Sequence, residues 1–178
     1  MIRLFAAIAV PDPVAEALVA RQQGLAGARW RPQESLHITL RFFAELAEPV
    51  ADELDLALGA IRVSPFDSAL EGAGAFGDEA HTRAVWAGVA DSEPLRRLAA
   101  KCETAARKVG LAAEHRVFRP HVTLAYLKHS APERVGAWVQ ENNLLKSPSF
   151  RVDRFGLYSS WQGPDGTRYD LERDYPLL

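Results

Sequence analysis

The sequence has very little of what marks exported, disulfide-stabilised or membrane proteins. It contains one cysteine, Cys102, which excludes a disulfide within the chain and fits a reducing compartment. No apolar run approaches the roughly 20 residues that cross a bilayer. The short apolar start ends at Pro11, so it predicts a buried first strand and not a signal peptide. We therefore expect a cytoplasmic protein that has no membrane segment.

Positive charge is also scarce. The 21 Lys and Arg residues are outnumbered by 23 Asp and Glu residues, which gives a net charge of −2. Proteins that coat long stretches of nucleic acid need a basic surface, because their affinity comes from many phosphate contacts. Any contact with RNA should therefore be local. Five arginines lie near the two motifs described below: Arg29, Arg31, Arg41, Arg116 and Arg119.

Metal-binding patterns are missing as well. The sequence has no His-Glu-x-x-His motif and no dense cluster of His, Asp and Glu. A single cysteine cannot form a thiolate zinc site. We expect neither a metal ion nor any other cofactor.

What the chain does contain is the composition of a globular protein, with 48% hydrophobic and 25% charged residues. Its 178 residues suit one domain, residues 1–178, or two small lobes that share one body. Apolar periodicity predicts strands at residues 4–9, 36–43, 65–70, 84–89, 122–127 and 150–158, and near Tyr169. It predicts helices at residues 13–23, 49–61, 94–109 and 132–140. Asp12 is the expected N-cap of the first helix, and three glycines predict a loop: Gly72, Gly74 and Gly77.

One arrangement of these segments occurs twice. An apolar strand is followed by a helix that a proline opens, and then by a strand that carries His-x-Thr-Leu. The first copy runs from Phe5 to His37, and the second runs from Trp86 to His121, over nearly equal separations. Two such units packed about a pseudo-two-fold axis would bring the histidines face to face across a shared cleft.

The spacing of the motif suits a strand. Side chains two residues apart project from the same face, so His37 and Thr39 point together while Ile38 points into a core. The same holds for His121 and Thr123. A single histidine on a strand is more often an ordinary structural residue than a catalyst. Two copies at the same place in a repeated unit favour the catalytic interpretation.

Two opposed histidines suit the cleavage of a phosphodiester. One group takes a proton from the attacking oxygen while the other gives a proton to the leaving oxygen on the opposite side of phosphorus. An unperturbed histidine titrates near pH 6.5, so one can be neutral while the other is protonated. Each transfer is worth roughly 10²- to 10⁴-fold in rate. The threonine hydroxyls can donate to the non-bridging oxygens.

The paired motifs resemble the 2H phosphoesterases, and specifically the RNA 2′,3′-cyclic phosphodiesterase branch once called 2′-5′ RNA ligases (LigT-like). The similarity covers nearly the whole chain, through residues 3–8, 30–32, 34–45, 85–89, 118–125 and 157–160. It implies an α+β fold in which two pseudo-two-fold lobes, with mainly antiparallel sheets, surround a central cleft. It also implies hydrolysis of RNA 2′,3′-cyclic phosphates to 2′-phosphates, with a weak reverse reaction that forms 2′-5′ linkages.

The resemblance further implies roles for individual residues. His37 would be the proton donor to the departing 3′ oxygen and His121 the proton acceptor that activates water, although pseudo-symmetry makes the opposite assignment plausible. Thr39 and Thr123 would hold the phosphate. Phe42 would either stack on a base or pack in the core. The expected partners are RNA ends or small cyclic nucleotides, and the expected state is a monomer.

Two positions depart from the family pattern. Many relatives carry an arginine just after the second His-x-Thr-Leu-Ala, where this chain has Tyr126. Arg119, Arg41 or the hydroxyl of Tyr126 itself would take over the contact with the phosphate. The glycine that usually precedes the glutamate of the first motif is Ala44, which we interpret as a tolerated backbone change.

Two other functions fit the same residues. One is a sister 2H activity, on 2′-5′ oligonucleotides or on an ADP-ribose 1″,2″-cyclic phosphate, and the shape of the pocket would decide between them. The other is a non-catalytic module that binds RNA or a nucleotide. The presence of both histidines and both threonines argues against this module, because arginines alone could supply binding.

Overall fold

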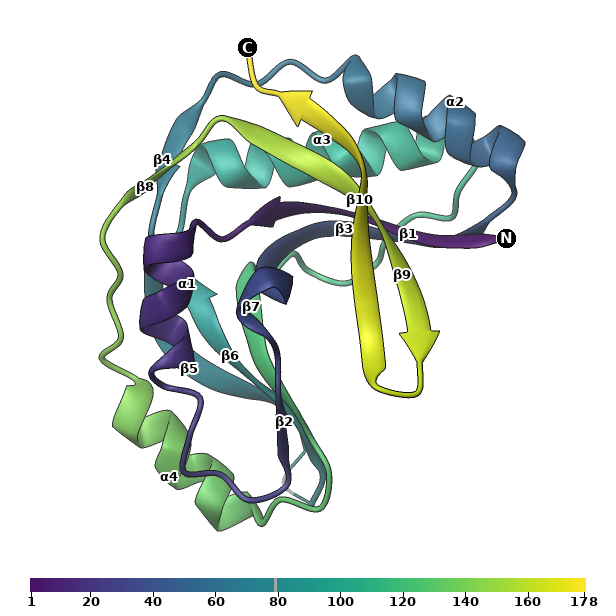
Figure 1. The fold of residues 1–178 in the computed structure, drawn as a ribbon. Coiled ribbons are helices and arrows are strands. Elements are labelled where there is room, and N and C mark those ends of the chain that lie inside the picture. Colours follow the sequence, from purple (N-terminus) through teal and green to yellow (C-terminus); the bar gives the residue numbers. More distant parts are fainter. Residues whose placement is uncertain (79) are drawn as a thin grey trace.

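The computed structural model describes residues 1–78 and 80–178 and has an α+β fold, as predicted (Figure 1). The strands are β1 (Ile2–Ala9), β2 (Ala28–Trp30), β3 (His37–Leu46), β4 (Phe66–Ser68), β5 (Leu70–Gly77), β6 (Thr82–Val89), β7 (His121–Leu127), β8 (Phe150–Val152), β9 (Arg154–Gly163) and β10 (Gly166–Pro176). The helices are α1 (Asp12–Val19), α2 (Glu48–Gly59), α3 (Glu93–Lys108) and α4 (Pro132–Asn142), with a 3₁₀ turn η1 (Gln33–Ser35). None of the helices in the described ranges is both long and apolar enough to span a bilayer.

One curved sheet organises the structure. Its strand order is β10-β9-β1-β3-β7-β6-β5, with β2 paired to β7, and all of these pairs are antiparallel. The central strands β3 and β7 share a single directly opposed pair, Ile38 and Val122. The sheet therefore divides there into a first lobe of β1, β3, β9 and β10 and a second lobe of β2, β5, β6 and β7. Strands β4 and β8 form a separate pair.

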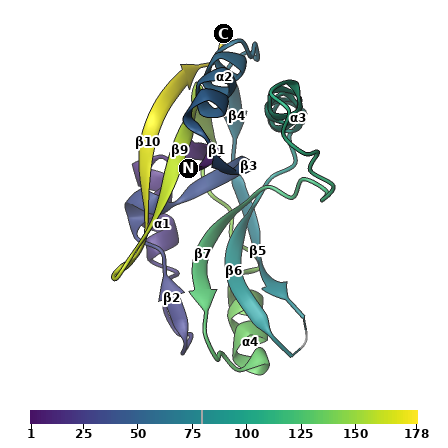
Figure 2. The same cartoon turned by 90° about the vertical axis from the view of Figure 1, so that its right-hand side faces the viewer.

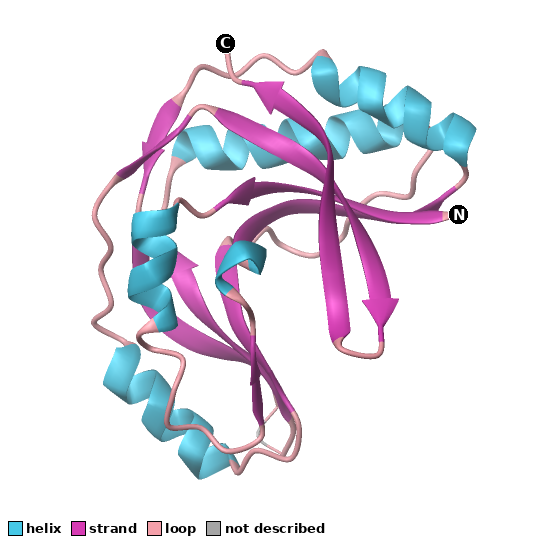
Figure 3. Cartoon of the chain, viewed as in Figure 1, coloured by secondary structure: helices cyan, strands magenta, loops and turns pink. Residues whose placement is uncertain are grey.

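Segments of each repeated unit contact elements of the other lobe. Helix α3, which connects β6 to β7 of the second lobe, packs against β3 of the first. The segment after α1, which belongs to the first unit, bonds to α4: the Arg21 guanidinium donates to Asn142 and the Trp138 indole donates to the Arg21 carbonyl. Helix α4 in turn covers β5 and β6. In Figures 2 and 3 the helices lie along the outer side of the curved sheet, and strands line its inner side.

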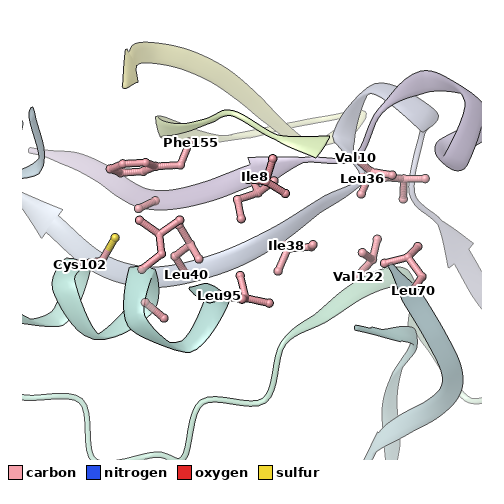
Figure 4. Close-up of a cluster of buried hydrophobic side chains, with 14 of the residues drawn as sticks. Ile8, Val10, Leu36, Ile38, Leu40, Leu70, Leu95, Cys102, Val122 and Phe155 are labelled. Carbon is pink, nitrogen blue, oxygen red and sulfur yellow. The ribbon is translucent and has the colours of Figure 1, made fainter. Parts of the chain in front are cut away.

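A single hydrophobic core runs beneath both lobes. Ile38 and Val122 at the junction are both 0% exposed. In Figure 4 the same cluster extends from Phe155 and Cys102 on the side of the first lobe to Leu70 on the side of the second. Because Ile38 and Val122 point into this core, the residues on either side of them must point to the inner side of the sheet.

A β-bulge changes the alternation in β3. Thr39 and Arg41 pair with adjacent residues of β1, which leaves Leu40 without a partner in the ladder. This extra residue shifts the alternation of side chains between the two faces of the sheet by one position beyond Leu40. As a result Phe42, and not Arg41, returns to the face that carries His37.

Strand β7 has the equivalent bulge. Thr123 and Ala125 pair with adjacent residues of β6, and Leu124 is left out of the ladder. Tyr126 therefore returns to the face of the second motif, as Phe42 does in the first lobe. The pseudo-symmetry of the two units thus extends three residues beyond each threonine, which the sequence pattern did not predict.

Four predictions about local structure were wrong. Asp12 is not the N-cap of the first helix, because the Pro11 carbonyl already accepts the first helical bonds, from Val14 and Ala15. That helix also ends at Val19, before Gln23. The predicted strand at residues 150–158 is two strands, β8 and β9, which pair with different partners.

The three glycines predicted to mark a loop, Gly72, Gly74 and Gly77, lie instead within strand β5. Gly74 is there for packing, since a Cβ at this position would lie 2.3 Å from the Trp86 indole of the neighbouring strand. The absence of a side chain lets that indole lie flat against the sheet, beside the second motif.

Ala44 carries backbone strain that can be tested. Its φ of 64° lies in the left-handed region, which costs an ordinary residue about 1–2 kcal/mol and glycine almost nothing. Ala44→Gly also makes the unfolded chain more flexible, which offsets part of the gain. We expect a net rise of about 0.5–1 kcal/mol in the free energy of unfolding, measured by urea denaturation.

The matched control is Ala137→Gly, at an exposed residue in the interior of helix α4, where glycine is less favourable than alanine. There the same change should lower the free energy of unfolding. Equal effects of the two substitutions would show that the backbone at Ala44 is not strained.

Candidate active site

The two His-x-Thr motifs meet on the inner side of the sheet. Their middle residues, Ile38 and Val122, are directly opposed in an antiparallel pair. In that register each motif histidine lies opposite the threonine of the other motif, and the two histidines are diagonal neighbours. Directly opposed residues are about 4.5–5.5 Å apart and diagonal ones about 7–8 Å. All four motif side chains are partly exposed, so they form a compact, accessible group of two imidazoles and two hydroxyls.

Both imidazoles are held in the same way. The Nδ1 atom of His37 lies 2.7 Å from the Ser35 carbonyl oxygen, and that of His121 lies 2.7 Å from the Arg119 carbonyl oxygen. A carbonyl oxygen only accepts, so each Nδ1 carries the proton and donates. In each neutral ring Nε2 then has the free lone pair. The equivalent nitrogens of the two histidines are thus available for proton transfer.

Burial lowers the pKa of both histidines, so neither has the unperturbed value that the sequence alone led us to expect. The pKa of His37 is lowered to about 4, mainly by desolvation; the bond to the Ser35 carbonyl opposes the shift, and the positive charge of Arg31 adds to it. Desolvation also lowers the pKa of His121. Both rings are therefore neutral near pH 7 in the substrate-free protein.

These shifts predict a pH profile displaced to acid. If one histidine must be protonated and the other neutral, kcat/KM is maximal between their two pKa values in the free enzyme. Below pH about 4 both are protonated and the base is lost; above the lowered pKa of His121 both are neutral and the acid is lost. We expect the maximum of kcat/KM for a small cyclic nucleotide below pH 6.5. A maximum above pH 7 would contradict the lowered pKa values.

Aromatic rings enclose each histidine. The His37 ring lies 5.0 Å from that of Phe5 and 5.2 Å from that of Tyr169, between ring centroids. These rings supply the apolar surroundings that desolvate the imidazole. Neither Phe5 nor Tyr169 was predicted to belong to the site. Strand alternation could have found Phe5, since it lies two residues before the partner of Thr39 in β1.

His121 has matching neighbours. Its ring lies 4.7 Å from that of Phe76, edge to face, and 6.0 Å from that of Trp86. Trp86 is also the ladder partner of Thr123. Phe76 belongs to the segment that was predicted as a glycine loop, which is why sequence reasoning missed it.

Phe42 and Tyr126 occupy equivalent positions beside the two motifs. They are 53% and 47% exposed, so Phe42 does not pack in the core. The Phe42 ring lies 5.6 Å from that of Phe5, which in turn touches His37. Each lobe therefore presents one accessible aromatic ring three residues beyond its motif threonine.

Arg41, one of the two arginines expected near the phosphate, does not lie with the histidines. Because of the bulge in β3, Arg41 points to the helix side of the sheet, where it forms an ion pair with Glu103 of α3. It also donates to the Ala112 carbonyl at 2.7 Å. The side chain of Arg119 is exposed, and the contact it makes with the site is through its backbone carbonyl, to His121.

Arg31 lies in the site instead. Its guanidinium carbon is 5.3 Å from the centroid of the Tyr169 ring and 5.7 Å from that of Tyr126. Its Nη2 donates to the Thr167 carbonyl at 3.3 Å, across the open side of the sheet. Arg31 was expected near the first motif, but no role was assigned to it. The fold was needed to show one, because Tyr126 and Tyr169 are far from it in sequence.

Within residues 1–78 and 80–178 the structure has no group of three or more His, Cys, Asp or Glu side chains placed to hold a metal ion. The polar groups that these residues bring together at the motifs are two imidazoles, two hydroxyls and the nearby guanidinium of Arg31.

Comparisons with known proteins agree on one family. The model of the 2′-5′ RNA ligase superfamily matches residues 10–163. An RNA 2′,3′-cyclic phosphodiesterase of Archaeoglobus fulgidus is 31% identical over 94% of this chain and 96% of its own length. One of Thermus thermophilus is 33% identical over 98% of this chain and 90% of its own.

Solved structures agree as well. The crystal structure of a Thermus thermophilus protein superimposes with a TM-score of 0.83 at 28% identity, covering 98% of this chain and 97% of that one. Escherichia coli LigT complexed with 3′-AMP superimposes with a TM-score of 0.81 at 26% identity, covering 99% and 98%.

Proposed function

The chain belongs to the 2′-5′ RNA ligase superfamily, and from this premise we propose that it hydrolyses 2′,3′-cyclic phosphates at RNA ends to 2′-phosphates. The observation that carries the proposal is the pairing of two His-x-Thr motifs on adjacent strands. Each histidine has its Nδ1 bonded to a backbone carbonyl, so each offers Nε2 to a ligand. A site with two equivalent imidazoles suits a reaction that needs one proton removed and one delivered.

The reaction uses one histidine for each oxygen. Nε2 of His121 accepts a proton from water as the water oxygen bonds to phosphorus. His37 gives a proton to the 3′ oxygen as its bond to phosphorus breaks, which leaves a 2′-phosphate. The hydroxyls of Thr39 and Thr123 donate to the non-bridging oxygens, where negative charge concentrates.

His37 becomes protonated together with the arrival of substrate. In the empty site its low pKa keeps it neutral at pH 7. The negative charge of a cyclic phosphate beside Nε2 favours the imidazolium and raises that pKa. An imidazolium held in apolar surroundings gives up its proton readily, which assists the departure of the 3′ oxygen.

The aromatic ring of Phe42 provides a surface for the base of the terminal nucleotide. It is more than half exposed and continues the row of rings that begins at His37 and Phe5. Stacking on one face does not select a particular base, so we expect RNA ends and small cyclic nucleotides of any base to be substrates.

The test is product identification in the presence of EDTA. The purified protein is incubated with a short RNA that ends in a 2′,3′-cyclic phosphate, and the phosphomonoester is identified by NMR or by its resistance to a 3′-specific phosphatase. The proposal expects a 2′-phosphate. A 3′-phosphate, or turnover restricted to 2′-5′ oligonucleotides or to ADP-ribose 1″,2″-cyclic phosphate, would contradict it.

A further inference from the structure

The motif strands supply two neutral imidazoles and two hydroxyls, but no permanent positive charge. A phosphate in the course of displacement carries negative charge on its non-bridging oxygens, which a guanidinium neutralises with fixed, paired donors. Arg41 is committed to Glu103 on the other side of the sheet, and the side chain of Arg119 is exposed. The guanidinium of Arg31, by contrast, lies beside two aromatic rings of the site.

On this basis, and resting on the function proposed above, we propose that Arg31 binds the substrate phosphate. Arg31 and His37 both lie beside the ring of Tyr169, at 5.3 Å for the guanidinium carbon and 5.2 Å for the imidazole centroid. The influence of the Arg31 charge on His37 reflects the same proximity. Arg31 and His37 thus share an aromatic neighbour, Tyr169, on the inner side of the sheet.

The surroundings of Arg31 hold its guanidinium but leave donors free. The rings of Tyr126 and Tyr169 are within 6 Å of the guanidinium carbon, in the range of cation–π contacts. The Thr167 carbonyl accepts from it. A guanidinium has five N–H donors, so this one acceptor does not saturate it. The remaining donors can bind phosphate oxygens.

This arrangement gives the two lobes different tasks. Phe42 and Tyr126 are equivalent through the two bulges, and both are accessible. The Phe42 ring is next to Phe5 and can receive a base, whereas the Tyr126 ring lies against Arg31. Tyr126 therefore serves as a support for the cation, and the substrate is oriented with its base towards the first lobe and its phosphate under Arg31.

The experiment compares Arg31→Gln with the wild type and with Arg31→Lys. Glutamine keeps a donor for the Thr167 carbonyl but has no charge. The variant therefore distinguishes a role of Arg31 as a phosphate ligand from a role as a structural tie between the lobes. We expect Arg31→Gln to weaken the binding of inorganic phosphate, and to lower kcat/KM for a 2′,3′-cyclic nucleotide, by about 10- to 100-fold each. Arg31→Lys should recover part of both losses, because it restores the charge without the planar fork.

A second variant tests whether the loss in Arg31→Gln comes from the missing charge and not from a disturbed fold. Tyr126→Arg in the Arg31→Gln background places a guanidinium on the same face of the site, and partial recovery of phosphate affinity is expected. Unchanged phosphate affinity and kcat/KM in Arg31→Gln would overturn the role of Arg31. If the wild type cleaves no cyclic phosphate, yet phosphate binding is lost in Arg31→Gln, the phosphate site stands and the proposed reaction fails.

Discussion

Replacing either motif histidine with alanine is expected to lower kcat for a nucleoside 2′,3′-cyclic phosphate by about 10²- to 10⁴-fold. His37 and His121 each present one Nε2 to the site, and β3 and β7 carry no other histidine. Neither ring can take over from the other, since each is fixed by its own carbonyl bond. The measurement is the initial rate at saturating substrate for both variants.

The two variants should differ on a substrate whose leaving group needs no proton. On a nucleoside 2′-(4-nitrophenyl) phosphate, His37→Ala is expected to recover most of its activity, because nitrophenolate departs unassisted. His121→Ala should remain impaired, because water must still lose a proton. The reverse pattern would show that His121 is the acid and His37 the base.

The control is His81→Ala. Its side chain is 85% exposed and lies beyond β5, away from the motif strands. Its removal should leave kcat unchanged on both substrates. A comparable loss in this variant would mean that histidine substitutions act on the whole protein and not on proton transfer.

The second large effect is on stability. Ile38→Ala is expected to lower the free energy of unfolding by about 2–5 kcal/mol. Ile38 is fully buried, and it is the residue through which β3 pairs with β7, opposite Val122. The lost methyl and methylene groups leave a cavity where the lobes join. Urea denaturation measures the change as a shift of the midpoint at constant slope.

A graded series checks the origin of this loss. Ile38→Val removes one methylene and should cost about 0.5–1.5 kcal/mol. Leu144→Ala removes an apolar side chain that is 88% exposed, so its effect should be close to zero. If Ile38→Ala and Leu144→Ala proved equally mild, the junction would not depend on close packing.

The sequence predicted well how the side chains of the two motifs are positioned, for a physical reason. Alternation along a strand requires no knowledge of the rest of the fold, so the burial of Ile38 and Val122 and the accessibility of the residues beside them could be anticipated. The repeated strand-helix-strand order was likewise sufficient to predict that the two motifs come from equivalent units, and β3 and β7 are indeed neighbours.

The other features of the site depend on contacts between segments that are distant in the sequence, which local sequence patterns do not reveal. A bulge is set by how two strands pair, so the sequence did not show that Phe42 and Tyr126 would share the face of the histidines and that Arg41 would not. Glycines usually interrupt strands, which concealed β5 and with it Phe76. The pKa values of the histidines follow from neighbouring rings that come from distant parts of the chain.

The contacts between the two repeated units suggest how a chain with this architecture can arise. Because α3 packs against β3, and Gln22, which follows α1, donates to the Leu124 carbonyl of β7, each strand-helix-strand unit contacts the other. A lone unit would expose the face that its counterpart covers, whereas two identical copies would satisfy each other as a closed two-fold dimer. The present chain has the arrangement expected of such a dimer with its two subunits joined end to end, and the two histidines come from the strands at which the units meet.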